Sequence, residues 1–161
     1  MPSLLARAHG RAGNRYAVDA ASAEAFDQLG RARPEDDPPW IYWCDEADLS
    51  GMVGEAYAYL GDTERAERCL RRAVELMDPA AHPRDRVLLL TRLASVHLPG
   101  DIERACAAGA EAVDVAAGLD SPRVAGHIAD LQARLAPFAG HLAVAELRER
   151  AAAMPQARPT P

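Results

Sequence analysis

Apolar residues recur every three or four positions along most of the chain, which is the period of an α-helix that buries one face. The clearest example lies between residues 62 and 77, where the opposite side carries the favourable i,i+4 pairs Glu64–Arg68 and Glu67–Arg71. Because this period recurs over most of the chain, the sequence predicts an all-α protein. The apolar positions of the 62–77 stretch are Ala66, Leu70, Ala73, Val74 and Met77.

A glycine followed by Asn or Asp separates these stretches at three places: Gly13-Asn14, Gly61-Asp62 and Gly100-Asp101. Glycine adopts the left-handed conformation that ends many helices, and Asn or Asp is a favoured first cap of the next one. Each pair therefore predicts the tight turn of an antiparallel helical hairpin. Their intervals of 48 and 39 residues indicate a repeat array.

The helix predicted before Gly61 is apolar on two sides, as expected of a helix packed between neighbours. One row runs through Trp43, Ala47, Ser50, Gly54 and Tyr57, and the other through Leu49, Val53, Ala56 and Leu60.

The C-terminal part predicts a further helical pair. Ser121-Pro122 is a cap followed by proline at the first helical position. Pro137 interrupts the apolar pattern, and residues 142–154 are expected to form a last helix. From Pro155 the sequence is rich in proline. We therefore expect one domain over residues 1–154 and a disordered tail over 155–161. The apolar stripe of the first helix is Val124, Ile128, Leu131 and Leu135.

The unit over residues 40–77 resembles the tetratricopeptide repeat. This resemblance implies a right-handed α-solenoid of antiparallel hairpins, with about three repeats and a C-terminal capping pair. Small residues in that family let the two helices approach closely, and an aromatic side chain fills the space between repeats. The residues that carry the match are Gly54, Tyr57, Gly61-Asp62, Ala66, Leu70 and Ala73.

A narrower resemblance links the chain to the C-terminal repeat region of actinobacterial helix-turn-helix transcriptional regulators. It implies a regulatory or interaction role in transcription, through binding of a protein or peptide. In those regulators a DNA-binding domain precedes the repeats; we expect this chain to lack it and not to bind nucleic acid directly. The matching segments are Pro38–Trp43, Asp45–Leu49, Arg84–Arg86 and Leu119–Ser121.

The repeat family displays the first helix of each hairpin along a concave groove. Transferring these positions predicts a groove that is basic at one end and acidic in the middle, able to hold an extended peptide by its charges. The alternative is that these are solvated polar positions. The candidate contacts are Arg7, Arg11, Asp48, Gly51, Glu55, Tyr59, Thr91 and Ser95.

The cluster Trp40-Ile41-Tyr42-Trp43 has two interpretations. Trp and Tyr are frequent anchors at protein interfaces. Large rings are more commonly buried, which here would seal the junction between the first two repeats. The second interpretation is favoured.

Catalytic and metal-binding patterns are missing from the sequence. The five histidines include no i,i+4 pair, and there is no HExxH, CxxC, phosphate loop or GxSxG. We therefore predict no enzyme, no cofactor and no metal site. Two other functions stay open: a small-molecule or signal-peptide sensor, and a structural module that self-associates.

Charge and composition limit which classes of partner and which cellular compartment are expected. The net charge of −6 argues against binding to phosphate backbones. No apolar run approaches the ~18 residues that span a bilayer, so no membrane contact is expected. Three widely spaced cysteines, Cys44, Cys69 and Cys106, indicate buried thiols in a reducing compartment. The sequence predicts a cytoplasmic protein.

Overall fold

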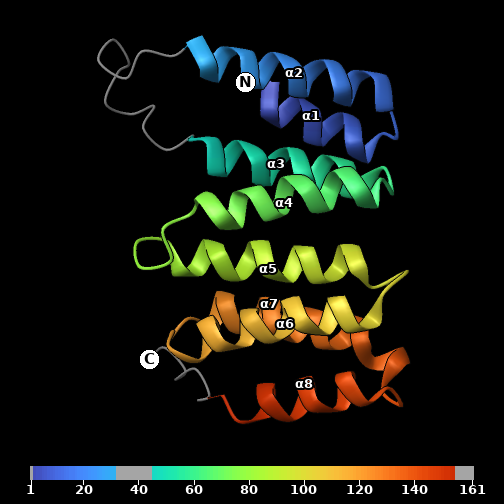
Figure 1. Cartoon of the computed structure of the whole chain (residues 1–161), viewed down its shortest axis with the longest axis vertical. Coiled ribbons are helices and arrows are strands. Elements are labelled where there is room, and N and C mark those ends of the chain that lie inside the picture. Colours follow the sequence, from blue (N-terminus) through green and yellow to red (C-terminus); the bar gives the residue numbers. More distant parts are fainter. Residues whose placement is uncertain (1, 32–44, 155–161) are drawn as a thin grey trace. The chain divides into compact units, whose positions relative to one another are not determined.

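The computed structural model describes residues 2–31 and 45–154, and within these ranges the protein is all-α, with no strand (Figure 1). The described ranges contain eight α-helices and one short 3-10 helix. The α-helices are α1 (Pro2–Arg11), α2 (Arg15–Arg31), α3 (Glu46–Tyr59), α4 (Thr63–Leu76), α5 (Pro83–His97), α6 (Ile102–Ala117), α7 (Pro122–Leu135) and α8 (Leu142–Ala152), and the 3-10 helix is η1 (Ala136–Phe138).

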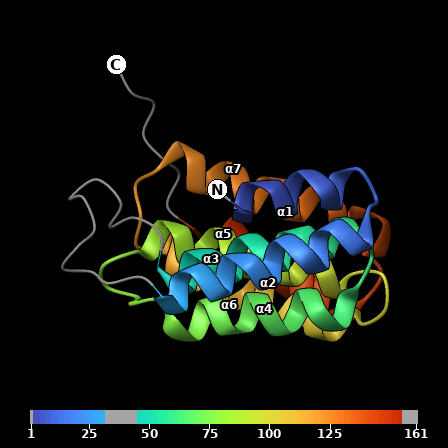
Figure 2. The same ribbon diagram turned by 90° about the horizontal axis from the view of Figure 1, so that it is seen from above.

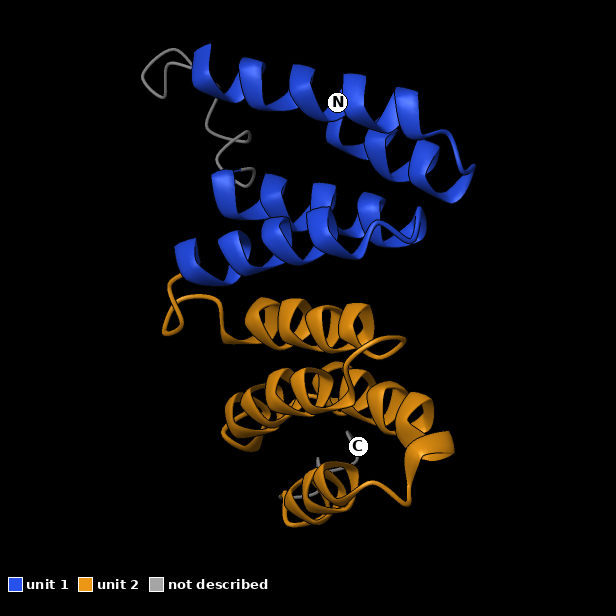
Figure 3. Cartoon of the chain, turned by 45° about the vertical axis from the view of Figure 1, so that its right-hand side comes forward, with its two compact units in different colours: residues 1–77 blue, residues 78–161 orange. Residues whose placement is uncertain are grey.

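The chain divides into two compact units, residues 1–77 and 78–161 (Figure 3). In the first unit, α1 packs lengthwise along α2 and also against α3, and α3 packs on α4 (Figure 2). In the second unit, α5 packs on α6 and α7, while α8 packs mainly on α6. In each unit, helices that are consecutive in the chain pack on each other, and so do some helices that are two apart, such as α1 and α3 or α5 and α7. The single domain expected over residues 1–154 stays a prediction.

Two of the three predicted glycine turns have the expected left-handed backbone. Gly13 has φ of 72° and Gly61 has φ of 69°. In both turns the residue after the glycine donates its backbone N–H to the carbonyl oxygen five residues earlier. Asn14 donates to His9, and Asp62 donates to Tyr57. This 6→1 bond is the Schellman closure that a left-handed glycine permits.

The third turn differs from the prediction, because Gly100 does not have positive φ. Leu98, the residue after α5, keeps right-handed helical angles. Asp101 then donates its backbone N–H to the carbonyl of His97 at 2.8 Å, an ordinary helical i→i−4 bond. Since the helical spiral simply continues for another turn, no left-handed residue is needed.

The predicted helix starts are confirmed at four positions. Asn14 Oδ1 accepts the N–H of Ala17 at 3.1 Å, and the side chains of the other three accept the N–H three residues ahead. These bonds satisfy N–H groups that a helix leaves without an internal partner. The other three capping residues are Asp62, Asp101 and Ser121.

The first unit is held together by close helix approaches at glycine. A Cβ on Gly54 of α3 would lie 2.8 Å from Leu70 Cγ of α4. A Cβ on Gly10 of α1 would lie 2.6 Å from the carbonyl oxygen of Ala56 in α3. Both predicted apolar rows of α3 are buried within the helix, because α1, α2 and α4 all pack against it.

The second unit has its own apolar core. The predicted α7 stripe is confirmed: its four members are buried, and Leu135 is 0% exposed. Gly109 of α6 packs against Leu131 and Leu147, so that α6, α7 and α8 meet at one point. Pro137 ends the α7 pattern as predicted, within η1.

Three predictions fall outside the described residues: the setting of the Trp40–Trp43 cluster, that of Cys44, and the tail over 155–161. In the described ranges, no helix is both long and apolar enough to cross a membrane.

Candidate functional site

Four of the eight predicted groove residues meet on one surface of the first unit. Arg7 and Arg11 extend from α1, one helical turn apart, and Glu55 and Tyr59 extend from α3 with the same spacing. The two helices pack side by side, so the four side chains contact one another although 44 or more residues separate the two pairs. We call this surface the α1–α3 face.

An ion pair forms the inner part of this face. Arg7 Nε lies 2.9 Å from Glu55 Oε2, and both atoms are buried. The Glu55 side chain is only 12% exposed, so water screens this pair less than it screens a surface salt bridge. Removing one partner would leave the other charge buried, which is strongly unfavourable.

An aromatic side chain forms the outer part of the face. The Tyr59 hydroxyl donates to Glu55 Oε1 at 3.0 Å and accepts from an Arg11 guanidinium nitrogen at 3.0 Å. The same guanidinium lies 5.0 Å from the centre of the Tyr59 ring, within cation–π range. Tyr59 is nevertheless 42% exposed. The ring is therefore held in place by two neighbours while one side of it faces solvent.

These contacts change the predicted character of the groove. The sequence suggested a basic end and an acidic middle that would each attract charges of a peptide. In the structure Arg7 and Glu55 neutralise each other, and Arg11 is engaged with Tyr59. What the α1–α3 face presents is a preorganised aromatic ring beside one exposed guanidinium, rather than separated charges.

The other four candidate residues have positions that are described by their own helices. Asp48 accepts the Asp45 N–H and forms the capping box at the start of α3. Gly51 is buried in the same helix. In α5 of the second unit, Thr91 donates its hydroxyl to the carbonyl of Leu88, and Ser95 donates to that of Thr91. Thr91 is also buried. These hydrogen bonds of Asp48, Thr91 and Ser95 lie within, or at the start of, their own helices.

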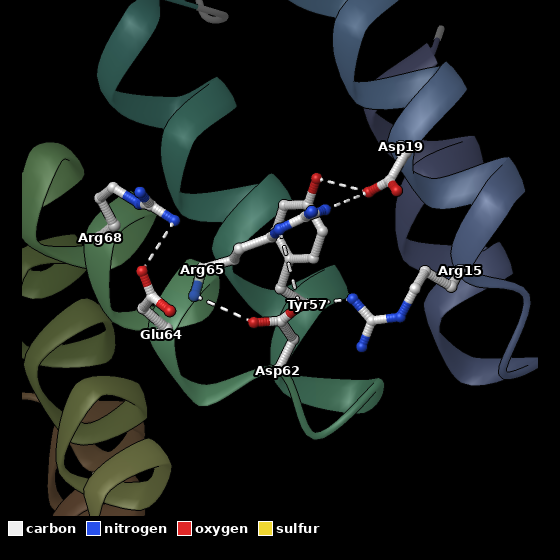
Figure 4. Close-up of polar contacts among 7 residues, drawn as sticks. All are labelled: Arg15, Asp19, Tyr57, Asp62, Glu64, Arg65 and Arg68. Carbon is white, nitrogen blue, oxygen red and sulfur yellow. Dashed lines mark hydrogen bonds and ion pairs between the residues drawn. The ribbon is translucent and has the colours of Figure 1, made fainter.

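Sequence reasoning missed a second polar cluster in the first unit, which links α2 to α3 and α4 (Figure 4). Asp19 Oδ1 accepts from the Tyr57 hydroxyl at 2.9 Å and from Arg65 Nη1 at 2.7 Å. Asp62 pairs with Arg15 and lies 3.7 Å from Arg65 Nε. The only local signal was that Arg15 and Asp19 are four residues apart and share one side of α2. Their partners, about 40 residues away, are not implied by that spacing.

The cluster perturbs two of its own acid groups. Burial, and secondly the hydrogen bond to Asp19, raise the pKa of Tyr57, so its hydroxyl stays a donor at neutral pH. The hydrogen bond from Arg15 lowers the pKa of Asp62, and the Arg65 backbone N–H adds to this effect while burial opposes it. Asp62 is therefore both the cap of α4 and an ionised link to α2.

The lowered pKa of Asp62 predicts a pH-dependent contribution to stability. This contribution is present above the ordinary carboxyl value of 3.8 and is lost as the pH falls below it through the folded-state pKa. Asn also caps helices well, so Asp62→Asn removes the charge and keeps the cap. We expect Asp62→Asn to be less stable than the natural chain at pH 7, with the gap narrowing below pH 3.8. Urea unfolding followed by circular dichroism at pH 7 and at low pH measures both values. A gap that is the same at both pH values would contradict the assignment.

The thiols and histidines show no metal-binding arrangement among the described residues. Burial raises the pKa of Cys69 and of Cys106, which keeps both thiols protonated at neutral pH. Cys106 is buried as predicted, but Cys69 is only partly so. Burial, then Arg123 and Arg92, lower the pKa of His127 on α7, so this imidazole is neutral at pH 7.

Comparisons with protein-family models, with curated proteins and with solved structures gave no match to this chain.

Proposed function

We propose that this chain is a protein- or peptide-binding module built from tetratricopeptide-like hairpins, arranged as a right-handed solenoid. The packing inside each unit supports this reading. In the first unit α1 and α3, the leading helices of successive hairpins, pack on each other, and in the second unit α5 and α7 do the same. Leading helices that lie side by side form a continuous strip on which a partner can lie.

The single observation that carries the proposal is the exposed but fixed ring of Tyr59. Tyrosine is over-represented among the residues that dominate binding energy, because a large ring loses little conformational freedom on binding. Here Glu55 and Arg11 already restrain the ring, so part of that ordering cost is met before a partner arrives. Leu4 is 49% exposed and lies one and two helical turns before Arg7 and Arg11, which adds apolar surface on the same side of α1.

The regulatory setting rests on the sequence resemblance to the repeat region of helix-turn-helix transcriptional regulators. In that setting the α1–α3 face recognises a peptide or protein signal, and DNA contact belongs to another polypeptide segment. The net charge of −6 agrees with a module that does not itself neutralise phosphates.

A displayed library of random peptides, selected on the natural chain, tests the proposal and does not require that the natural partner be identified first. Tyr59→Ala is the decisive variant. For the selected peptides we expect Tyr59→Ala to raise Kd by about tenfold or more, as for other aromatic hot spots. Fluorescence polarisation of the labelled peptides gives the two constants, and far-UV circular dichroism verifies that the variant is still helical.

The matched control is Tyr16→Ala. Tyr16 lies on α2 and is 84% exposed, so the same atoms are removed from a surface outside the α1–α3 face. This variant should bind the selected peptides as the natural chain does. Peptides that bind the natural chain and Tyr59→Ala equally well, or a selection that enriches none, would refute the proposed face.

A further inference from the structure

The second unit contains a cavity of about 250 Å³ between α6 and α8. Its walls are the small side chains of Ala107, Ala110 and Ala143, which leave space where larger residues would fill the helix junction. Cys106 and Leu147, each only 4% exposed, form its floor. We call this feature the α6–α8 groove.

The rim of the groove carries a net negative charge. Glu103 and Glu146 line it, both are exposed, and neither side chain has an ion-pair or hydrogen-bond partner among the described residues. Arg150 also lines the groove, but it forms two hydrogen bonds with Asp114, at 2.8 and 2.9 Å. Since Asp114 balances the charge of Arg150, the two glutamates leave the groove with a net negative charge.

An apolar groove with an acidic rim is complementary to a side chain that is apolar along its length and cationic at its tip. Arginine and lysine have this form, since their methylene stems pack on apolar surface while the charge stays near water. Arginine fits better, because its planar guanidinium donates to two carboxylates at once.

We propose that the α6–α8 groove is a docking site for a basic segment of a partner protein, with an arginine side chain inserted between the two helices. Its stem contacts Ala107, Ala110 and Ala143, and its guanidinium pairs with Glu103 and Glu146. A protein segment is favoured over a small amine because the apolar surface continues outside the cavity. Leu142, which directly precedes Ala143, is 72% exposed and offers contact to residues beside the inserted arginine.

The reactivity of the Cys106 thiol can be used to detect whether the groove is occupied. Its thiol is free, lines the groove and is almost completely buried. An occupant of the groove covers the remaining access to this sulfur, so it should slow alkylation by iodoacetamide. Cys69 in the first unit is free and partly exposed, and serves as an internal control in the same sample.

The first test titrates a fluorescein-labelled peptide of six arginines into the full chain at low ionic strength, where charge contributions are largest. The variant Glu103→Gln/Glu146→Gln should raise Kd by about tenfold, the effect of removing two close charge partners. The control Glu111→Gln/Glu149→Gln removes two exposed charges from the same helices outside the groove lining, and should change Kd by less than about twofold. If both variants lost affinity equally, the binding would come from general attraction between the basic peptide and the acidic chain, and the proposal would be overturned. Absence of binding to the natural chain would also overturn it.

The second test measures alkylation of each cysteine by mass spectrometry, with and without the peptide. We expect the peptide to protect Cys106 from alkylation but not Cys69. The variant Ala107→Leu, whose larger side chain fills the groove, should abolish peptide binding and should slow Cys106 alkylation even without peptide. Unchanged Cys106 alkylation at saturating peptide would place the peptide elsewhere and overturn the proposal. Equal protection by the same concentration of free agmatine would assign the groove to small amines and overturn the assignment to a partner protein.

Discussion

Replacing Leu70 with alanine is expected to lower the free energy of unfolding by about 3 kcal/mol, within the range observed when a buried leucine is truncated and leaves a cavity. Leu70 is completely buried at the junction of α3 and α4, against Gly54. Urea unfolding monitored by circular dichroism gives the value. A loss below about 1 kcal/mol would mean that the site collapses around the smaller side chain, contrary to the tight packing described.

The reciprocal change, Gly54→Ala, should cost about 1–3 kcal/mol, because overpacking a filled junction displaces its neighbours. The new Cβ would lie 2.8 Å from Leu70 Cγ and 3.1 Å from Leu70 Cδ2, and it would also lie 3.1 Å from the Leu70 backbone nitrogen. In the double variant the two Leu70 side-chain atoms are gone, so only the approach to the backbone nitrogen is left, and the added methyl occupies part of the cavity.

The two effects should therefore not add. Residues in direct contact commonly show coupling energies of about 0.5–3 kcal/mol, and here the double variant is expected to be more stable than the sum of the single changes by about 1 kcal/mol or more. A matched cycle combines Leu70→Ala with Gly126→Ala, a substitution on α7 that meets no atom within 4 Å. That cycle should be additive. Coupling of the same size in both cycles would show that the effect does not come from the Gly54–Leu70 contact.

Local chemistry is the part of this fold that the sequence predicted well. Helix starts at Asn14, Asp62 and Asp101 follow from side chains that reach only three residues ahead. The buried stripe that includes Leu131 follows from the 3.6-residue period. Such features depend on neighbours in the chain, so a single sequence contains all the information they need.

Contacts between distant segments were predicted only in part, because they depend on how one helix packs on another. Arg7 and Glu55 were both identified as polar positions on leading helices, but the sequence did not imply that they pair with each other. The cluster around Asp19 was missed because its partners lie 38 and 46 residues further along the chain, on other helices. At Gly100 the error was local: the residue type suggested a left-handed turn, but the chain continues its right-handed spiral.

The close approach of α1 and α3 determines whether the α1–α3 face exists at all. Gly10 lies between Arg7 and Arg11 in the sequence and touches α3 directly. A Cβ there would lie 2.6 Å from the Ala56 carbonyl oxygen and 3.0 Å from Ala56 Cα. Since these are backbone atoms, no side chain can rotate away, and relief requires that α1 move as a whole.

Gly10→Ala is therefore expected to lower the free energy of unfolding by about 3 kcal/mol, at the upper end of ordinary overpacking costs. The matched control, Gly30→Ala in α2 of the same unit, meets no atom within 4 Å. It should be neutral or stabilise by up to about 0.5 kcal/mol, because alanine restricts the unfolded chain and favours helix. Urea unfolding of both variants beside the natural chain measures the difference.

The same displacement of α1 would separate Arg7 from Glu55 and Arg11 from Tyr59. Gly10→Ala should consequently weaken the binding of peptides selected through Tyr59 even under conditions where most of the chain is folded, whereas Gly30→Ala should leave their Kd unchanged. If Gly10→Ala proved as stable as Gly30→Ala and bound those peptides normally, the close contact between α1 and α3 would be refuted. The restrained Tyr59 ring that depends on this contact would be refuted with it.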